Sequence, residues 1–210
     1  VGLEPQTIIS NVEMFMDDLE DITGHHYEPS FNRKGAEILL VVPSGDLYAE
    51  PGIFTFMGYI TLLEHLGVDY TLSTYASEGG NFGFFTTNEM AKRLNAKIYA
   101  ESKRLGVKWI LGGECGHMWR VMNQYMDTWN GPADWLEMPV SPITGTKFEN
   151  AASTKMIHIV EFTADLIHNN KLKFDKSRND DLVVTFHDSC NTARGMGILD
   201  EPREIIKAVC

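Results

Sequence analysis

Residues 182–205 read Leu-Val-Val-Thr-Phe-His-Asp-Ser-Cys-Asn-Thr-Ala-Arg-Gly-Met-Gly-Ile-Leu-Asp-Glu-Pro-Arg-Glu-Ile, and this stretch decides the predicted fold. The apolar, β-branched run at 182–186 predicts a short buried strand, and His187-Asp188-Ser189-Cys190 follows where that strand would end. Asp200-Glu201-Pro202 then predicts the first turn of a helix, because acidic residues and proline favour that position. The stretch therefore predicts a strand, a loop that carries a cysteine at the strand's carboxyl end, and a helix. Functional sites of α/β folds lie at such strand ends.

Strands and helices alternate along the earlier part of the chain. Apolar runs predict strands at 38–42, 68–73 and 107–111, and periodic patterns predict helices at 53–66 and 88–104. Further amphipathic patterns predict helices at 5–23 and 157–167. The β-α-β-α-β order predicts an α/β fold with a parallel sheet flanked by helices, of the doubly wound type.

The first half of the chain echoes the second half. The strand predicted at 38–42 is followed by a Ser-Gly loop and Glu50-Pro51, as the run at 182–186 is followed by the Cys190 loop and Glu201-Pro202. This echo predicts two duplicated, Rossmann-like modules. The predicted organisation is an N-terminal helix and linker at 1–36, a first module at 37–130, a linker at 131–153 and a second module at 154–210.

The composition is that of an ordinary soluble domain. Hydrophobic residues make up 43% of the 210 residues and charged residues 22%. The net charge of −11, with 18 Lys and Arg against 29 Asp and Glu, excludes a typical nucleic-acid-binding protein. Three widely spaced cysteines do not form a disulfide framework, so we expect a reducing cytoplasmic location. The longest apolar stretch, 53–63, is too short for direct membrane insertion.

His187-Asp188-Ser189-Cys190, followed by Gly-Ile-Leu-Asp-Glu-Pro-Arg-Glu-Ile at 197–205, resembles the cysteine-rich (CCG) domain found in the D subunit of heterodisulfide reductase. Within this family the likeness is greatest to DsrK, the K subunit of the membrane complex that serves dissimilatory sulfite reductase. The family motif contains a first cysteine, a Cys-Cys-Gly and a closing Cys-x-x-Cys, and it holds a 4Fe–4S cluster of non-cubane type. The first cysteine of that motif corresponds to Cys190, whereas the Cys-Cys-Gly and the closing pair have no match in the second module.

The first module looks like a degenerate copy of the same motif. Ser44-Gly45-Asp46 stands where its first cysteine would be, and Ser77-Glu78-Gly79-Gly80 resembles a replaced Cys-Cys-Gly. Cys115 resembles the start of the closing Cys-x-x-Cys, with Met118 in place of its second cysteine. Because Cys115 also follows a predicted strand, we expect it to share one cleft with Cys190, whereas Cys210 should be more remote and packed.

The resemblance implies an iron–sulfur oxidoreductase that breaks or forms disulfide or trisulfide bonds in dissimilatory sulfur metabolism. It implies that Cys190 is a cluster ligand and that Cys115 is either a second ligand or a thiol beside the cluster. His187, His117 and Glu114 are the candidates for hydrogen bonds to the cluster or for proton delivery.

The implied partners are the redox subunits of a membrane complex, together with a small thiol-carrier protein or a small disulfide. The chain itself would be cytoplasmic and would reach the membrane peripherally, through those subunits. The helical pattern reaches Cys210 without a C-terminal capping signal, so we expect a longer polypeptide that supplies the missing cysteines.

Three alternatives remain open at this point. Cys115, His117, His187 and Cys190 could form a tetrahedral zinc site, although Cys-x-His is an unusually tight spacing. The chain could instead be a non-catalytic docking module of a redox complex. A thiol redox sensor that uses Cys115 and Cys190 would require the two thiols to lie close together.

Overall fold

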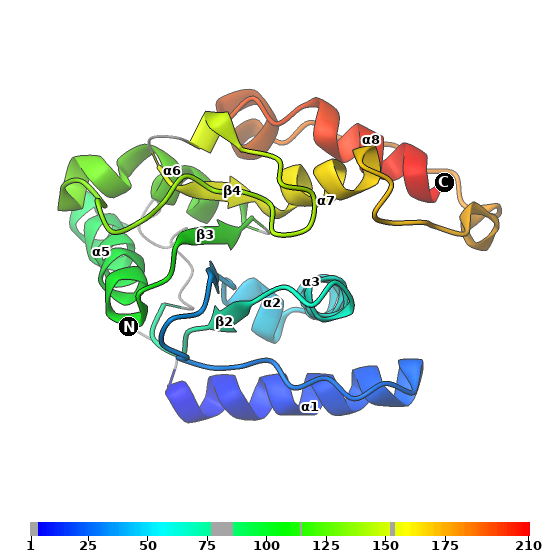
Figure 1. Ribbon diagram of the computed structural model, residues 1–210, viewed down its shortest axis with the longest axis horizontal. Helices are drawn as coiled ribbons and strands as arrows, with labels where there is room; N and C mark the ends of the chain where they lie inside the picture. The colour runs from blue at the N-terminus through cyan, green and yellow to red at the C-terminus, as the bar shows by residue number, and fades with distance from the viewer. Residues whose placement is uncertain (1–3, 77–85, 114, 152–153) are drawn as a thin grey trace.

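Four parallel strands form the centre of the molecule (Figure 1). The computed structural model describes residues 4–76, 86–113, 115–151 and 154–210. The strands are β1 (Ile38–Leu40), β2 (Tyr70–Leu72), β3 (Trp109–Gly112) and β4 (Met156–His158), in the order β2-β1-β3-β4. Ile38 pairs with Tyr70 on one side and with Trp109 on the other, and Ile110 pairs with Met156. The predicted α/β fold with a parallel sheet is confirmed.

Helices cover both faces of this sheet. The α-helices are α1 (Pro5–Thr23), α2 (Gly45–Tyr48), α3 (Glu50–His65), α5 (Asn88–Leu105), α6 (Gly116–Asn130), α7 (Ile159–His168) and α8 (Asp200–Val209). Three short helical turns are η1 (Glu149–Ala151), η2 (Lys176–Asn179) and η3 (Cys190–Gly195), of which η3 is a π-helical turn. Since side chains alternate along a strand, Ile38 and Leu40 pack with α1, α3 and α7, whereas Leu39 packs with α5 and α6. The result is a three-layer α/β/α arrangement.

The strand predicted at 182–186 is absent from the structure. This segment is exposed and has no regular secondary structure, and it pairs with none of the four strands. The prediction of a buried strand is wrong for the described residues, because the sheet ends at β4 and 182–186 adds no strand to it. The Rossmann-like duplication is accordingly not confirmed.

A strand also replaces the beginning of a predicted helix. The apolar run at 157–167 predicts a helix throughout, but Met156–His158 forms β4 and α7 begins only at Ile159. His158 ends the strand and caps the helix, because its Nδ1 accepts a hydrogen bond from the backbone N–H of Val160. A three-residue buried strand that leads directly into an apolar helix has no periodicity that would separate the two.

The last part of the chain extends to one side of the sheet (Figure 1). Helix α8 packs along α7, and η2 is fastened to the end of α8 by the amide of Asn179, which donates to the carbonyl of Val209 at 2.6 Å. Lys176 also donates to the carbonyl of Lys207. None of the residues of α8 is buried. Among the helices that the structure describes, none is long and apolar enough to cross a membrane.

Candidate functional site

Two cysteine-bearing loops lie against each other although 75 residues separate them in sequence. Cys115 occupies the N-cap position of α6, after the loop that leaves β3, and Cys190 is the first residue of η3. The turn η3 packs on α6, and the approach is close at Gly116, where an added Cβ would lie 2.7 Å from Thr192 Oγ1. Glycine is therefore needed beside Cys115 for the Cys190 turn to pack there.

The Cys190 turn is held by its own polar groups. Ser189 Oγ accepts hydrogen bonds from the backbone N–H groups of Thr192 and Ala193, which satisfies the start of the turn. At its other end the backbone N–H of Ile198 donates to the carbonyl of Thr192, and the Ile198 side chain is buried among residues of α5 and α6. Both ends of the turn are thus fixed, while Cys190 itself remains exposed.

Arg120 and Asn191 add polar contacts beside Cys190. The Asn191 amide nitrogen lies 3.7 Å from Cys190 Sγ and donates toward it, and the Arg120 guanidinium donates to Asn191 Oδ1 at 3.3 Å. Arg120 also borders Gly195, where an added Cβ would lie 3.4 Å from Arg120 Nη1. Sequence reasoning missed both residues. An amide donor beside a thiol, itself held by a second side chain, can orient that thiol as a ligand.

An ion pair joins the residues before Cys190 to helix α8. Arg203 lies 2.7 Å from Asp188, and its guanidinium is 5.5 Å from the centre of the Phe186 ring. The hydrogen bond from Arg203 lowers the pKa of Asp188, and the pair raises the pKa of Arg203. Asp188 and Arg203 both belong to the stretch that resembles the cysteine-rich family. The two residues of this ion pair therefore both come from the family-like stretch, and their contact ties the Cys190 loop to α8.

The buried side chain of His158 packs against the loop that carries Cys115. His158 is 4% exposed, and its Nε2 faces Gly113, whose φ of +140° and lack of a side chain allow the approach. An added Cβ at Gly113 would lie 2.4 Å from this Nε2. The ring also makes an edge contact with Trp119, with 5.1 Å between centroids. Burial lowers the pKa of His158 to about 4, with the Gly113 backbone opposing the shift, so the imidazole is neutral at neutral pH.

Glu161, in the first turn of α7, lies beside this histidine and near Glu201 of α8. The Glu161 carboxylate accepts a hydrogen bond from the His158 backbone N–H at 2.8 Å. Burial raises the pKa of Glu161, the His158 N–H opposes this, and the negative charge of Glu201 raises it further. Together with His158 Nδ1, Glu161 completes the cap of α7.

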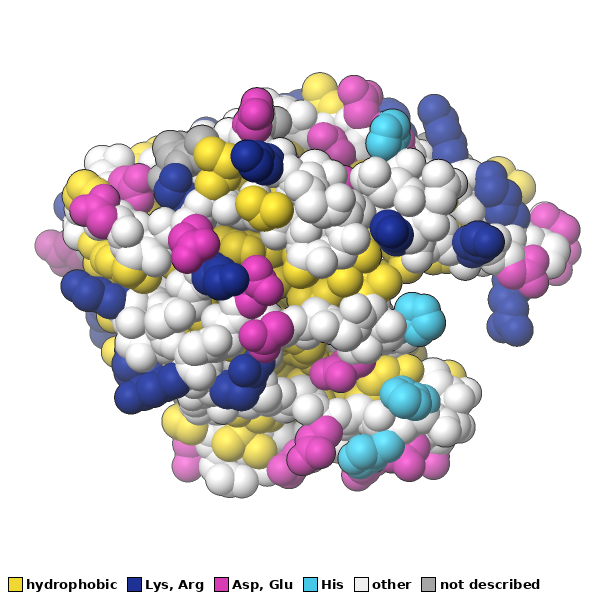
Figure 2. Space-filling view, viewed as in Figure 1, with side chains coloured by type: hydrophobic (Ala, Val, Ile, Leu, Met, Phe, Trp, Pro, Cys, Tyr) yellow, Lys and Arg dark blue, Asp and Glu magenta, His cyan; other side chains and the backbone are white. Residues whose placement is uncertain are grey.

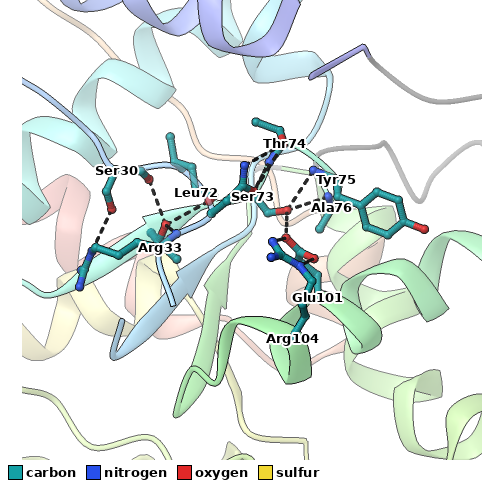
Figure 3. A network of polar contacts seen from close by, with 11 residues as sticks. Ser30, Arg33, Leu72, Ser73, Thr74, Tyr75, Ala76, Glu101 and Arg104 are labelled. Carbon is teal, nitrogen blue, oxygen red and sulfur yellow. Dashed lines mark hydrogen bonds and ion pairs between the residues drawn. The ribbon is translucent and has the colours of Figure 1, made fainter. Parts of the chain in front are cut away.

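A second polar network fixes the loop after β2 (Figure 3). Ser73 Oγ donates to the buried Glu101 at 2.8 Å and accepts hydrogen bonds from the backbone N–H groups of Tyr75 and Ala76. Arg104 binds both oxygens of Glu101. Burial alone would raise the pKa of Glu101, but Arg104 and Ser73 outweigh it and hold the pKa below its usual value. This loop leads toward Ser77–Gly80, where the sequence suggests a replaced Cys-Cys-Gly and which lies outside the described residues.

The structure brings some of the predicted site residues together and places others elsewhere. Cys115 and Cys190 lie on abutting loops, His117 is in the first turn of α6, and His187 is exposed just before Cys190. Glu114 lies outside the described residues. Cys210 is exposed at the end of α8, so the expectation that it would be packed is wrong for this chain.

The arrangement of these residues does not form a complete metal site. Within the described residues, no three or more His, Cys, Asp or Glu side chains are placed to hold a metal ion. Cys115, His117, His187 and Cys190 are all described, which argues against the four-ligand zinc site. Two thiols on abutting loops do fit part of an iron–sulfur ligand set, because such clusters are held by cysteine thiolates.

Comparisons with known proteins identify relatives of the whole chain. No family model matches the sequence, and no solved structure does. The Hdr-like menaquinol oxidoreductase iron-sulfur subunit 2 of Archaeoglobus fulgidus is 43% identical over 226 aligned residues, which cover 100% of this chain. The corresponding iron-sulfur subunit of Archaeoglobus profundus is 42% identical over the same share.

The chain spans 41% of the length of these two relatives. A shorter match, 40% identical over 55 residues and 26% of this chain, is to the D subunit of the dihydromethanophenazine:CoB--CoM heterodisulfide reductase of Methanosarcina mazei. That match covers 13% of the Methanosarcina protein.

Proposed function

The comparisons support the family of the heterodisulfide reductase D subunit for this chain, and from this premise we propose that it is part of an iron–sulfur oxidoreductase subunit. The observation that carries the proposal is that relatives named as iron–sulfur subunits match the chain over 100% of its length. We also propose, more specifically, that the chain is most similar to DsrK and that its cluster is a 4Fe–4S cluster of non-cubane type.

The two abutting cysteine loops provide the structural support. In the proposal Cys190 is a cluster ligand, because it is exposed on a turn fixed at both ends and has Asn191 as a donor to its sulfur. Cys115 is either a second ligand or a thiol beside the cluster, and its loop rests on His158. His117, His187 and Glu114 remain the candidates for proton delivery. The other ligands come from a longer polypeptide, which supplies the Cys-Cys-Gly and the Cys-x-x-Cys.

The proposed reaction is the reduction of a sulfur–sulfur bond. Two electrons and two protons convert R–S–S–R′ into RSH and R′SH, and oxidation of one quinol to its quinone releases the same number of each. A bound cluster would supply these electrons one at a time. The relatives are named menaquinol oxidoreductase subunits, so we propose a menaquinol-oxidising membrane complex as the source of electrons. The electron acceptor would be a small disulfide or a thiol-carrier protein of dissimilatory sulfur metabolism.

The location follows from the same proposal. The chain would lie on the cytoplasmic side and would attach to the membrane peripherally, through the quinol-oxidising subunits. No residue of the described part needs to enter the bilayer in this arrangement.

An apolar groove favours one alternative, the docking module. The groove runs between α1, α3, α7 and α8 and is lined by Leu19, Ile22, Phe54, Leu62, Phe174 and Val209. Figure 2 shows hydrophobic side chains where the surface is hollowed between the part of the molecule with α7 and α8 and the part with α1 and α3. In this alternative the chain would hold a redox partner without taking part in electron transfer itself.

Anaerobic expression of the whole polypeptide from its gene would test the proposed function. We expect the purified protein to contain iron and acid-labile sulfide, and its reduced visible spectrum to return to the oxidised form when a small disulfide is added. A protein without iron would contradict the proposal and favour the docking module. An iron-containing protein that disulfides leave reduced would contradict the proposed substrate class.

A further inference from the structure

The segment 182–187 has the side chains of a buried strand but lies in solvent. Val183 is 101% exposed, Leu182 58%, Val184 52% and Phe186 42%. β-Branched and aromatic residues of this kind are enriched in strands that pack against other strands. Monomeric soluble proteins rarely leave several such residues exposed in one run, and a run of this kind usually marks an interaction site.

The backbone of the same segment is also without partners. The N–H of Leu182 donates to the carbonyl of Asn179, and the next hydrogen bonds toward the C-terminus belong to Asp188 and Ser189. From Val183 to His187, no backbone N–H or C=O group makes a hydrogen bond to any residue that the structure describes. An apolar segment whose backbone donors and acceptors are free can pair with another strand.

Both ends of the segment are fixed to α8. At one end η2 is tied to the last turn of α8 through Asn179 and Val209, and at the other end Asp188 pairs with Arg203. Phe186 lies against the same Arg203 guanidinium. Fixing both ends of the segment in advance reduces the entropy that pairing would otherwise cost.

Helix α8 beside the segment is incompletely covered as well. It carries Ile205, Ile206 and Val209, yet none of its residues is buried, although it packs along α7. A helix with this composition normally buries its apolar face against a sheet. The segment and the helix thus both carry apolar side chains that the described residues leave exposed or only partly covered.

We infer that residues 182–187 form an interface strand that pairs with a β-strand from the part of the polypeptide outside these 210 residues. The length of the relatives supports this occupant, because they match all of this chain but it spans only 41% of their length. More than half of each relative is thus available to provide the missing strand. The inference does not require an iron–sulfur cluster.

Hydrogen–deuterium exchange of the whole polypeptide tests the inference directly. We expect the amides of 183–187 to exchange at least about tenfold more slowly in the whole polypeptide than in the 210-residue chain at the same dilute concentration. Equally fast exchange in both proteins would overturn the inference. Protection that appears in the 210-residue chain only as its concentration rises would show that a second copy is the partner, and would also overturn it.

A matched pair of variants provides an independent measurement. Val183→Asp should lower the melting temperature of the whole polypeptide, because a charge would enter a strand interface, but should leave that of the 210-residue chain unchanged. Met14→Asp, at a 53% exposed position on α1, controls for adding a charge to an exposed apolar residue. If Val183→Asp changes the whole polypeptide no more than Met14→Asp does, the segment is not an interface.

A gene that encodes no further residues would also contradict the inference. If iron is absent but the segment is protected, the proposed function fails while the interface stands. If iron is present and the segment exchanges freely, the interface inference fails while the proposed function stands.

Discussion

At the residue scale, the cysteines are supported by side chains that the sequence could not single out. Arg120 contacts Asn191 across 71 residues, and His158 contacts the Gly113 backbone across 45. Neither pairing has a local sequence signal, because both depend on how β3, β4 and α6 come together. Cys190 and Asp188 could be identified because they lie within one family-like stretch. The Asp188–Arg203 pair, 15 residues apart, could have been found from that same stretch.

His158 should make the stability of the protein depend on pH. Its pKa is about 4 in the folded state and 6.5 when unfolded, so between these values only the unfolded state takes up the proton. The free energy of unfolding therefore falls as the pH falls from 6.5 through 4, and the contribution of His158 to this fall is on the order of 3 kcal/mol. His158→Asn keeps an acceptor for the Val160 N–H but cannot be protonated. We expect urea denaturation at a series of pH values to give a flatter profile for this variant.

His65→Asn, at an exposed position at the end of α3, is the matched control for losing one histidine. If His158→Asn and His65→Asn give the same pH profile, then His158 is not the buried neutral group that supports the Cys115 loop.

At the element scale, the sequence predicts most helices and three of the four strands. The helices α1, α3, α5 and α8 follow from amphipathic periodicity and from helix-start residues, and β1, β2 and β3 follow from short apolar runs. Strand β4 is missed because Met156–His158 is short and continues into the apolar pattern of α7. The run at 182–186 is apolar and β-branched and so predicts a buried strand, but none of the strands that the structure describes pairs with it.

The packing of η3 on α6 can be tested at Gly116. An added Cβ would lie 2.7 Å from Thr192 Oγ1, so Gly116→Ala should destabilise the protein by about 1–3 kcal/mol through overpacking. Thr192→Ala removes the opposing atom, and the double variant should therefore recover part of the loss. Gly58→Ala is the matched control, since nothing lies within 4 Å of an added Cβ there. It should stabilise α3 by up to about 1 kcal/mol.

Denaturant unfolding of the wild type and of these four variants measures the changes in the free energy of unfolding. Additive effects of Gly116→Ala and Thr192→Ala would contradict the close contact between the loops of Cys115 and Cys190.

At the scale of the whole molecule, the packing of η3 on α6 explains where the two cysteine loops meet. The chain leaves β3 toward Cys115, and the packing of η3 on α6 places Cys190 on the neighbouring loop. The two cysteine loops are therefore brought together by helix packing and not by two adjacent strand ends. That the two cysteines share one cleft stays a prediction. The apolar groove and the segment 182–187 both leave hydrophobic side chains exposed. Exposure of this extent fits a chain that belongs to a larger assembly.

The central claim is that Cys190 is a ligand of an iron–sulfur cluster, and one measurement tests it most directly. The iron and acid-labile sulfide content of the whole polypeptide, with the electron paramagnetic resonance of its cluster, should be determined for Cys190→Ser and for Cys210→Ser. Replacing sulfur by oxygen barely changes side-chain volume, so both variants should fold. We predict that Cys190→Ser loses the wild-type resonance and much of the iron, whereas Cys210→Ser keeps both. A wild-type resonance and full iron content in Cys190→Ser would contradict the account.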